Sequence, residues 1–197
     1  LSLLEFNRRV IEQAKDENLP LLERLRFLCI ASTNLDEFFE IRVAGLKQQV
    51  KYGSTQTGPD NLSPTEVLTR VSETAHQFVE EQYSVWNDLI IPAMAKDNIR
   101  LLRRSQWKSQ TSRWIHRYFK DEVLPVLSPI GLDPAHPFPK VQNKNLYFII
   151  SLDGKDAFGR DSGLAIVQAP RSLPRVIPVP AKYSDGNHDF VMLSSII

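Results

Sequence analysis

The first half of the chain carries, at residues 32–42, the stretch Ser32-Thr33-Asn34-Leu35-Asp36-Glu37-Phe38-Phe39-Glu40-Ile41-Arg42. Residues that favour helix caps precede an acidic and apolar run, which predicts a helix from Asn34 to about Tyr52. The amide of Asn34 also carries donors and an acceptor that suit the edge of a purine base, but local chemistry alone favours the cap. Asp36 and Glu37 are candidate metal ligands, although attraction to the helix N-terminus explains them without a metal.

Helical spacing of apolar residues continues on both sides of this stretch. It predicts a first helix that Ser2 caps and that ends at residues 16–18, a second helix over about residues 20–30, and a long helix from residue 64 that Pro92 kinks or ends. Ser2 and Glu5 form one predicted capping box, and Ser63-Pro64-Thr65-Glu66 is a stronger start signal because it adds a proline at the first helical position. A polar loop is expected over residues 53–61. Residues 1–100 therefore predict an all-α bundle of about four helices.

Prolines and glycines become more frequent after residue 100, and the pattern changes to mixed α/β. Residues 98–102 predict a short extended joint, residues 105–123 a helix, and residues 124–145 an irregular segment. Runs of β-branched and aromatic residues predict a buried strand over 146–152 and further strands over 164–168, 175–179 and 189–193. Residues 194–197 open another helix. The predicted fold class is α+β, with a helical domain over 1–100 and an incomplete α/β domain over 101–197.

Composition narrows the classes of protein to which the chain can belong. It has 197 residues, with 24 Lys and Arg against 23 Asp and Glu, so the net charge is +1. This balance argues against a protein that binds nucleic acid through bulk charge.

The single cysteine cannot form an internal disulfide, which favours a reducing cytoplasm. No stretch approaches the roughly 20 apolar residues that span a bilayer. Because the chain starts at Leu1 and stops at Ile197, we expect a fragment of a longer protein.

Familiar catalytic motifs are absent from the sequence: there is no phosphate-binding glycine loop, no dinucleotide fingerprint and no serine elbow. Cys29 is expected to be a small buried apolar residue. Among the four histidines, His76, His116 and His188 are expected to be surface or loop residues. His136 lies in the proline-stiffened segment 133–139, where a structural role is also favoured. A basic run faces either solvent or a polyanion, and it comprises Arg100, Arg103, Arg104, Lys108, Arg113, Arg117 and Lys120.

Several stretches, in this order and spacing, resemble polyphosphate kinases of the four-domain bacterial type. In the first half they are Leu3-Leu4-Glu5-Phe6-Asn7-Arg8-Arg9-Val10, Pro20-Leu21-Leu22-Glu23-Arg24-Leu25-Arg26-Phe27-Leu28, and Asn34-Leu35-Asp36-Glu37-Phe38-Phe39 with Arg42-Val43-Ala44. In the second half they are Leu124-Pro125-Val126-Leu127-Ser128-Pro129 and Asp133-Pro134-Ala135-His136-Pro137-Phe138-Pro139, which resemble the second domain of that family.

This resemblance implies a parent protein that reversibly transfers the terminal phosphate of ATP to inorganic polyphosphate through a phosphohistidine. It implies that the phosphorylated histidine and the Mg²⁺ site belong to C-terminal domains, so this chain is expected to hold no catalytic residue and to be inactive alone. It also implies that the nucleotide-contacting asparagine of the family corresponds to Asn34, which reverses the local preference for a cap.

The partners implied by the resemblance are ATP or ADP, polyphosphate, and further copies of the chain in a dimer or tetramer formed through the second, or head, domain. Nucleic acid is not among them. The implied location is the cytoplasm, with peripheral association to a membrane as a variant. The alternative reading of the chain is a non-enzymatic helical module that docks other proteins through its first half.

Overall fold

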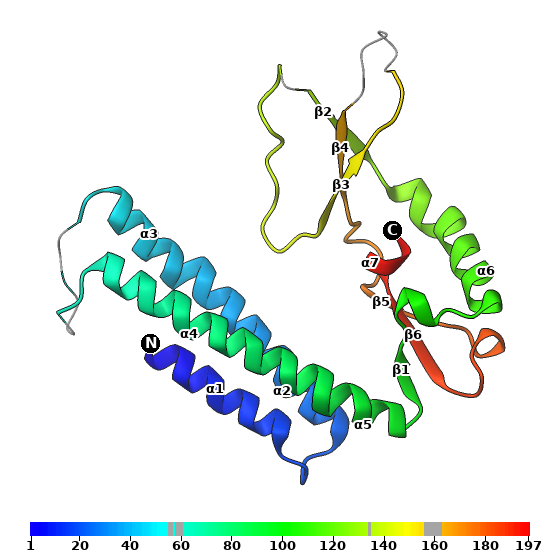
Figure 1. Ribbon diagram of the computed structural model, residues 1–197, viewed down its shortest axis with the longest axis horizontal. Helices are drawn as coiled ribbons and strands as arrows, with labels where there is room; N and C mark the ends of the chain where they lie inside the picture. Colours follow the sequence, from blue (N-terminus) through cyan, green and yellow to red (C-terminus); the bar gives the residue numbers. More distant parts are fainter. Residues whose placement is uncertain (55–56, 58–60, 134, 156–162) are drawn as a thin grey trace. The chain divides into compact units, whose positions relative to one another are not determined.

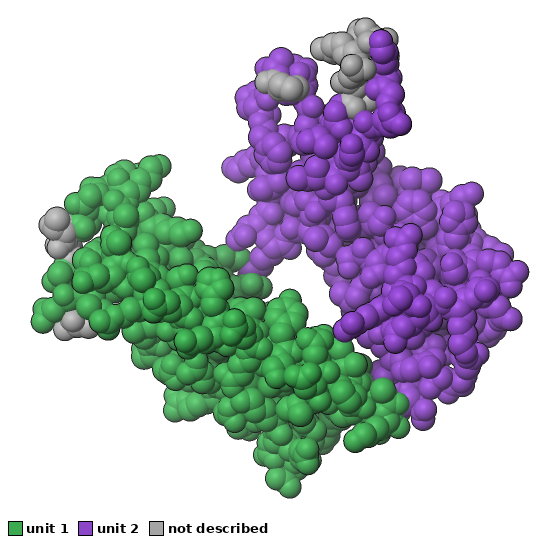
Figure 2. Space-filling view, viewed as in Figure 1, with its two compact units in different colours: residues 1–97 green, residues 98–197 purple. Residues whose placement is uncertain are grey.

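The computed structural model describes residues 1–54, 57, 61–133, 135–155 and 163–197. Its residues form two compact units, residues 1–97 and residues 98–197, which Figure 2 colours separately. The first unit is helical, and the second combines helices with two small sheets (Figure 1). The predicted α+β class is therefore confirmed.

The described residues of unit 1 form three helical rods. The first is α1 (Ser2–Lys15). The second joins α2 (Leu21–Phe38), the π turn η1 (Phe39–Val43) and α3 (Ala44–Lys51) without interruption. The third joins α4 (Pro64–Ser84), the π turn η2 (Val85–Ile90) and α5 (Ile91–Lys96) in the same way. Pro92 is accommodated at the start of α5, directly after η2, so it does not end the rod. The predicted loop over 53–61 lies partly outside the described residues.

The predicted helix break at residues 32–34 is wrong, because α2 runs through it. The Thr33 hydroxyl donates a hydrogen bond to the Cys29 carbonyl of its own helix at 3.1 Å, so this polar side chain does not interrupt the backbone ladder. Asn34 therefore lies within α2 and is not a cap. Asp36 and Glu37 are likewise far from the helix start, which removes the explanation that they complement an N-terminal dipole.

The two predicted capping boxes have opposite outcomes. Helix α1 begins one residue earlier than expected, and its cap position, Leu1, makes no side-chain hydrogen bond, so the Ser2 box is wrong. The Ser63 box at the start of α4 is confirmed. The Ser63 hydroxyl accepts from the Glu66 backbone N–H, and the Glu66 carboxylate accepts from the Ser63 backbone N–H at 2.8 Å.

The Ser63–Glu66 box makes part of the stability of α4 dependent on pH. Hydrogen bonds from the side chain and then the backbone of Ser63 lower the pKa of Glu66 below its ordinary value of 4.5. A carboxyl group with a lowered folded-state pKa stabilises the fold above its unfolded pKa, and this contribution is lost as pH falls through the lower value. Glu66→Gln keeps an acceptor that does not titrate, so its helix content is expected to fall less than that of the parent between about pH 5 and pH 3. Circular dichroism during acid titration checks this, and identical curves for the two proteins contradict it.

Helix α1 packs through a stripe with helical spacing, formed by Leu4, Asn7, Ile11 and Ala14. One backbone carbonyl near the C-terminal end of α1 accepts a hydrogen bond from α2: Nε of Arg24 donates to the Ala14 oxygen at 3.0 Å. Arg24 is itself buried. Glu81 of α4 accepts ion pairs from two α1 residues, Arg8 at 3.4 Å and Lys15 at 2.5 Å. Together these contacts fix α1 against both long rods.

In the part of unit 2 that the structure describes, the strands form two three-stranded sheets (Figure 1). In the first, the order is β1 (Ile99–Leu101), β6 (His188–Met192) and β5 (Val176–Pro178), with β1 parallel and β5 antiparallel to β6. In the second, the order is β2 (Pro129–Leu132), β4 (Leu164–Gln168) and β3 (Tyr147–Ser151), all antiparallel. The remaining elements are η3 (Arg104–Gln106), α6 (Ser109–Tyr118), the π turn η4 (Phe119–Val123), η5 (Leu124–Val126), η6 (Ala181–Tyr183) and α7 (Leu193–Ile196).

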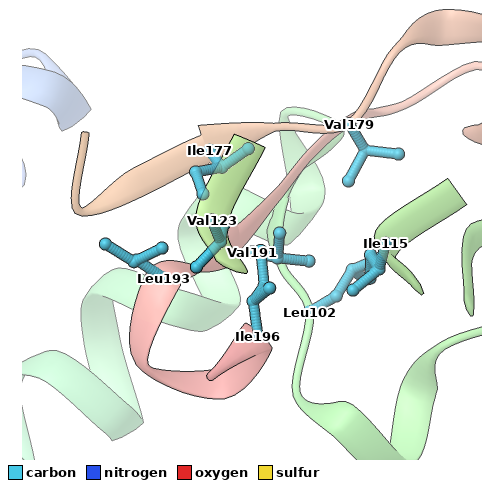
Figure 3. Packing of buried hydrophobic residues seen from close by; sticks show 8 residues of the cluster. All are labelled: Leu102, Ile115, Val123, Ile177, Val179, Val191, Leu193 and Ile196. Carbon is cyan, nitrogen blue, oxygen red and sulfur yellow. The ribbon is translucent and has the colours of Figure 1, made fainter. Parts of the chain in front are cut away.

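The core of unit 2 forms on the first sheet and its helices. Figure 3 shows side chains from β5, β6, α6, η4 and α7 pointing toward one another. The buried cluster comprises Leu102, Ile115, Val123, Ile177, Val179, Val191, Leu193 and Ile196. The second sheet buries mainly its central strand β4.

The sequence predicts the positions of four strands of unit 2 correctly, but it predicts the burial of one of them wrongly. Strands were expected near those that became β3, β4, β5 and β6, and the helix at the end of the chain is α7. The expected buried strand over 146–152 is instead β3, an edge strand, and its Ile149 is 63% exposed. The sequence predicts an extended joint where β1 lies and an irregular segment where β2 lies. These strands have only three and four residues, which is too short for an alternation of apolar and polar residues to be recognised. Helix α6 starts at Ser109, later than the predicted residue 105.

Candidate functional site

A pocket in unit 1 lies between α1 and the second rod. Its volume is about 260 Å³. Pockets that enclose whole drug-sized ligands measure about 300–1,000 Å³, so this one suits a single ring system better than an entire nucleotide. We call it the α1–α2 pocket, and it is lined by Leu3, Leu4, Phe6 and Asn7 of α1, Asn34, Glu37 and Phe38 of α2, and Ile41 and Arg42 of η1.

The sequence of α1 explains why the pocket is apolar. The apolar face of this helix is wider than the stripe that the bundle buries. Leu3 and Phe6 therefore remain 50% and 52% exposed, at the edge of the helix facing the pocket, and Ile41 of η1 is exposed as well. Exposed apolar side chains that gather around a few polar groups are typical of ligand sites.

Two asparagines supply uncharged polar groups to the lining of the pocket. Asn7 is 3% exposed, and its Nδ2 donates to the carbonyl oxygen of Ala31 at 2.8 Å. The Nδ2 of Asn34 donates to Oδ1 of Asn7 at 3.0 Å. Within the described part of the chain, no other hydrogen bond of the Asn34 side chain is found. Its Oδ1 and one N–H therefore stay available in a half-buried position.

Charged groups stand at the rim of the same pocket. Glu37 and Arg42 both line it, and both are exposed. Phe38 contributes an aromatic ring, which packs edge-on against Phe39 with 6.0 Å between ring centroids. An apolar wall, an amide and a guanidinium suit a flat heterocycle that carries hydrogen-bonding atoms on its edge and an anionic group nearby.

The structure thus brings together Asn34, Glu37, Phe38 and Arg42 of the stretch that opens the sequence analysis, but not Asp36. It adds Asn7, whose role sequence reasoning missed. The available signal was the spacing of Leu4, Asn7, Ile11 and Ala14, which puts one polar residue on the buried stripe of α1. A polar residue at such a position needs a hydrogen-bond partner inside the fold.

The other candidate residues stay on the surface. His76, His116 and His136 are exposed, and Nδ1 of His136 lies 3.3 Å from the Asp133 carboxylate. His188 was expected in a loop and is the first residue of β6. Cys29 was expected to be buried, but it is exposed, because the buried side of α2 is formed by Arg24, Leu28 and Ala31 instead.

The basic run of unit 2 is partly neutralised within its own unit. Arg100 forms two hydrogen bonds to Asp189, and Lys108 pairs with Asp185 and lowers the pKa of that carboxyl group. Arg104 lies 5.9 Å from the centroid of the Trp107 ring. These contacts leave less free positive charge for a polyanion than the sequence alone indicates.

The described ranges contain no group of three or more His, Cys, Asp or Glu side chains arranged to hold a metal ion. Nor is any helix in those ranges both long and apolar enough to cross a membrane.

Two family descriptions match almost the whole chain. The polyphosphate kinase N-terminal domain matches residues 1–102, and the polyphosphate kinase middle domain matches residues 110–197. The chain belongs to the polyphosphate kinase family.

Individual relatives agree with this assignment. The chain is 56% identical over 197 residues to a polyphosphate kinase of Pseudomonas putida and 53% identical to one of Pseudomonas aeruginosa. It is similar in structure to the crystal structure of polyphosphate kinase from Porphyromonas gingivalis, with a TM-score of 0.82 and 27% identity over the whole chain. The chain spans 27%, 29% and 28% of the lengths of these three proteins.

Proposed function

We propose that the full-length protein containing this chain reversibly transfers the terminal phosphate of ATP to inorganic polyphosphate through a phosphohistidine, and that the α1–α2 pocket holds the adenine ring. Membership of the polyphosphate kinase family supports the reaction class. The pocket supports the assignment of the adenine site, because its volume suits one ring system and its walls are apolar.

The observation that carries the adenine assignment is the position of Asn34. Its amide lies in the wall of an apolar pocket and keeps an acceptor and a donor available. An asparagine amide can bond two adjacent atoms on the edge of adenine, the exocyclic amino group and a ring nitrogen. In this proposal Phe38 and Leu3 of the pocket lining contact the faces of the base, and the Arg42 guanidinium binds a phosphate.

The chemical step is assigned to residues outside this chain. Covalent transfer through a histidine splits one difficult phosphoryl transfer into two easier ones. We assign this role to none of His76, His116, His136 and His188, and we expect Mg²⁺ to bind in the remaining domains. There it would neutralise charge on the phosphates. Unit 1 corresponds in this proposal to the N-terminal domain, and unit 2 to part of the head domain, whose surface forms dimer contacts in the cytoplasmic protein.

Asn34→Ala in the full-length protein tests the adenine assignment. The variant is expected to raise the KM for ATP by roughly 5- to 100-fold with little change in kcat, since a lost hydrogen bond at a partly buried site is worth about 1–3 kcal/mol. Steady-state kinetics at saturating polyphosphate measures it.

Thr33→Ala is the matched control for this test. Thr33 is the neighbouring residue and is exposed, and among the described residues its hydroxyl bonds only within its own helix. The KM of the Thr33→Ala variant for ATP is therefore expected to equal that of the parent. An unchanged KM in Asn34→Ala, in a protein that melts at the parent temperature, would sink the adenine assignment.

A further inference from the structure

The orientation of the Asn34 amide is determined by a chain of hydrogen bonds that starts at a main-chain carbonyl. The Ala31 oxygen can only accept, so the Asn7 atom 2.8 Å from it must be the donor Nδ2. Asn7 therefore turns Oδ1 toward Asn34. Because Oδ1 can only accept, the Asn34 atom 3.0 Å away must be Nδ2. Both amides are thus fixed without any choice of rotamer flip.

Burial makes this arrangement costly to reverse. Asn7 is 3% exposed, so water cannot replace its partners. Reversing Asn34 would bring its Oδ1 against Oδ1 of Asn7, and reversing Asn7 would bring its Oδ1 against the Ala31 oxygen. Either flip leaves two acceptors facing each other. The pocket therefore meets a ligand with one defined edge of Asn34, an oxygen acceptor beside one N–H donor.

We propose that Asn7 is a positioning residue that holds the Asn34 amide in the orientation that selects a base with an exocyclic amino group. This proposal rests on the function proposed above. Adenine presents an amino donor next to a ring-nitrogen acceptor, which matches the acceptor and donor of Asn34. A 6-oxo purine presents an oxygen where adenine has the amino group, so its oxygen would meet Oδ1 of Asn34.

Kinetics with ATP and inosine triphosphate tests the proposal in the full-length protein. Inosine triphosphate differs at the base edge by carrying the 6-oxo group. The parent is expected to prefer ATP by roughly 10-fold or more in kcat/KM, because mispaired polar groups in a site are strongly rejected. Asn7→Leu removes both hydrogen bonds and frees the Asn34 amide to turn. Its preference for ATP is expected to fall at least about 5-fold, with a raised KM for ATP and a nearly unchanged kcat.

Two further variants separate positioning from general destabilisation. Asn7→Asp keeps an acceptor toward Asn34 and is expected to retain most of the preference for ATP. It is also expected to lower the melting temperature, because its second carboxyl oxygen faces the Ala31 carbonyl. Ile11→Val lies on the same buried stripe, away from the pocket, and is expected to lower the melting temperature without changing the preference.

The outcomes distinguish this inference from the function on which it rests. If Asn34→Ala raises the KM for ATP but Asn7→Leu keeps the parent preference, the positioning role is wrong and the adenine site stands. If Asn34→Ala changes nothing, both fail. Equal use of the two nucleotides by the parent protein overturns the proposal even if no Asn7 variant folds.

Discussion

Asp189→Ala is expected to destabilise unit 2 by about 2–4 kcal/mol, because it leaves the Arg100 guanidinium without its partner. Asp189 is 3% exposed and accepts from Nε and Nη2 of Arg100 at 2.7 and 2.8 Å, and from the Ser184 hydroxyl at 3.0 Å. Arg100 and Asp189 face each other across the parallel pair β1 and β6. Their fork geometry fixes the register of these strands and holds the short strand β1 in the sheet.

Urea unfolding of Asp189→Ala and Asp189→Asn, alone and combined with Arg100→Met, measures this effect. The Asn variant is expected to lose less, since it still accepts from Ser184. Asp185→Asn is the matched control. Asp185 pairs with Lys108 on the surface, so little change is expected there. A loss for Asp189→Ala no larger than that of the control would show that the Arg100 pair contributes nothing to unit 2.

Phe78→Ala is expected to destabilise unit 1 by about 3–5 kcal/mol, the usual range for a fully buried aromatic side chain. Phe78 is 1% exposed and has the largest of the fully buried side chains among the described residues. It follows Val71 and Ala75 on the buried face of α4, the helix that also binds α1 through Glu81. Removing the ring leaves a cavity that the long rods cannot close without bending.

Loss of helical circular dichroism in urea measures the effect of Phe78→Ala. Phe78→Leu leaves a smaller cavity and is expected to cost less than half as much. Tyr83 lies on the same helix and is 61% exposed, so Tyr83→Ala is the control and is expected to change the midpoint little. Equal midpoints for Phe78→Ala and Tyr83→Ala would contradict the packing of α4.

The strongest local signal predicted its structure correctly, whereas weaker ones did not. The Ser63 box and Pro64 at the start of α4 need only neighbours in sequence, and they were read correctly. Ser32-Thr33-Asn34 carries similar cap-forming residues, yet α2 continues through it. There Asn34 bonds to Asn7, 27 residues away in the sequence, and α2 continues as one long helix. The same long-range contact replaces the predicted cap role of Asn34 with a place in the α1–α2 pocket.

Burial was harder to predict than element type. The apolar run that forms β3 indicated a strand correctly, but exposure follows from its place at the edge of a three-stranded sheet, which no local pattern encodes. The prediction that Cys29 is buried was wrong for a related reason. Arg24 lies on the buried side of α2 because it donates a hydrogen bond to the end of α1. The proposed role of Asn34 in binding a nucleotide comes from the resemblance alone. The structure adds the pocket around it, which periodicity does not predict.

The hydrogen-bond chain from Ala31 through Asn7 to Asn34 also constrains how this part of the protein changes over evolutionary time. It joins side chains on two helices through a single pair of amides. A substitution at one asparagine leaves a polar group of the other without its partner. Once one asparagine has been replaced, replacing the other therefore costs less stability than it would in the parent protein. The two positions are therefore expected to be inherited together and replaced together. Under the proposed selection of the purine base, homologues that have changed only one of the two positions are expected to be rare.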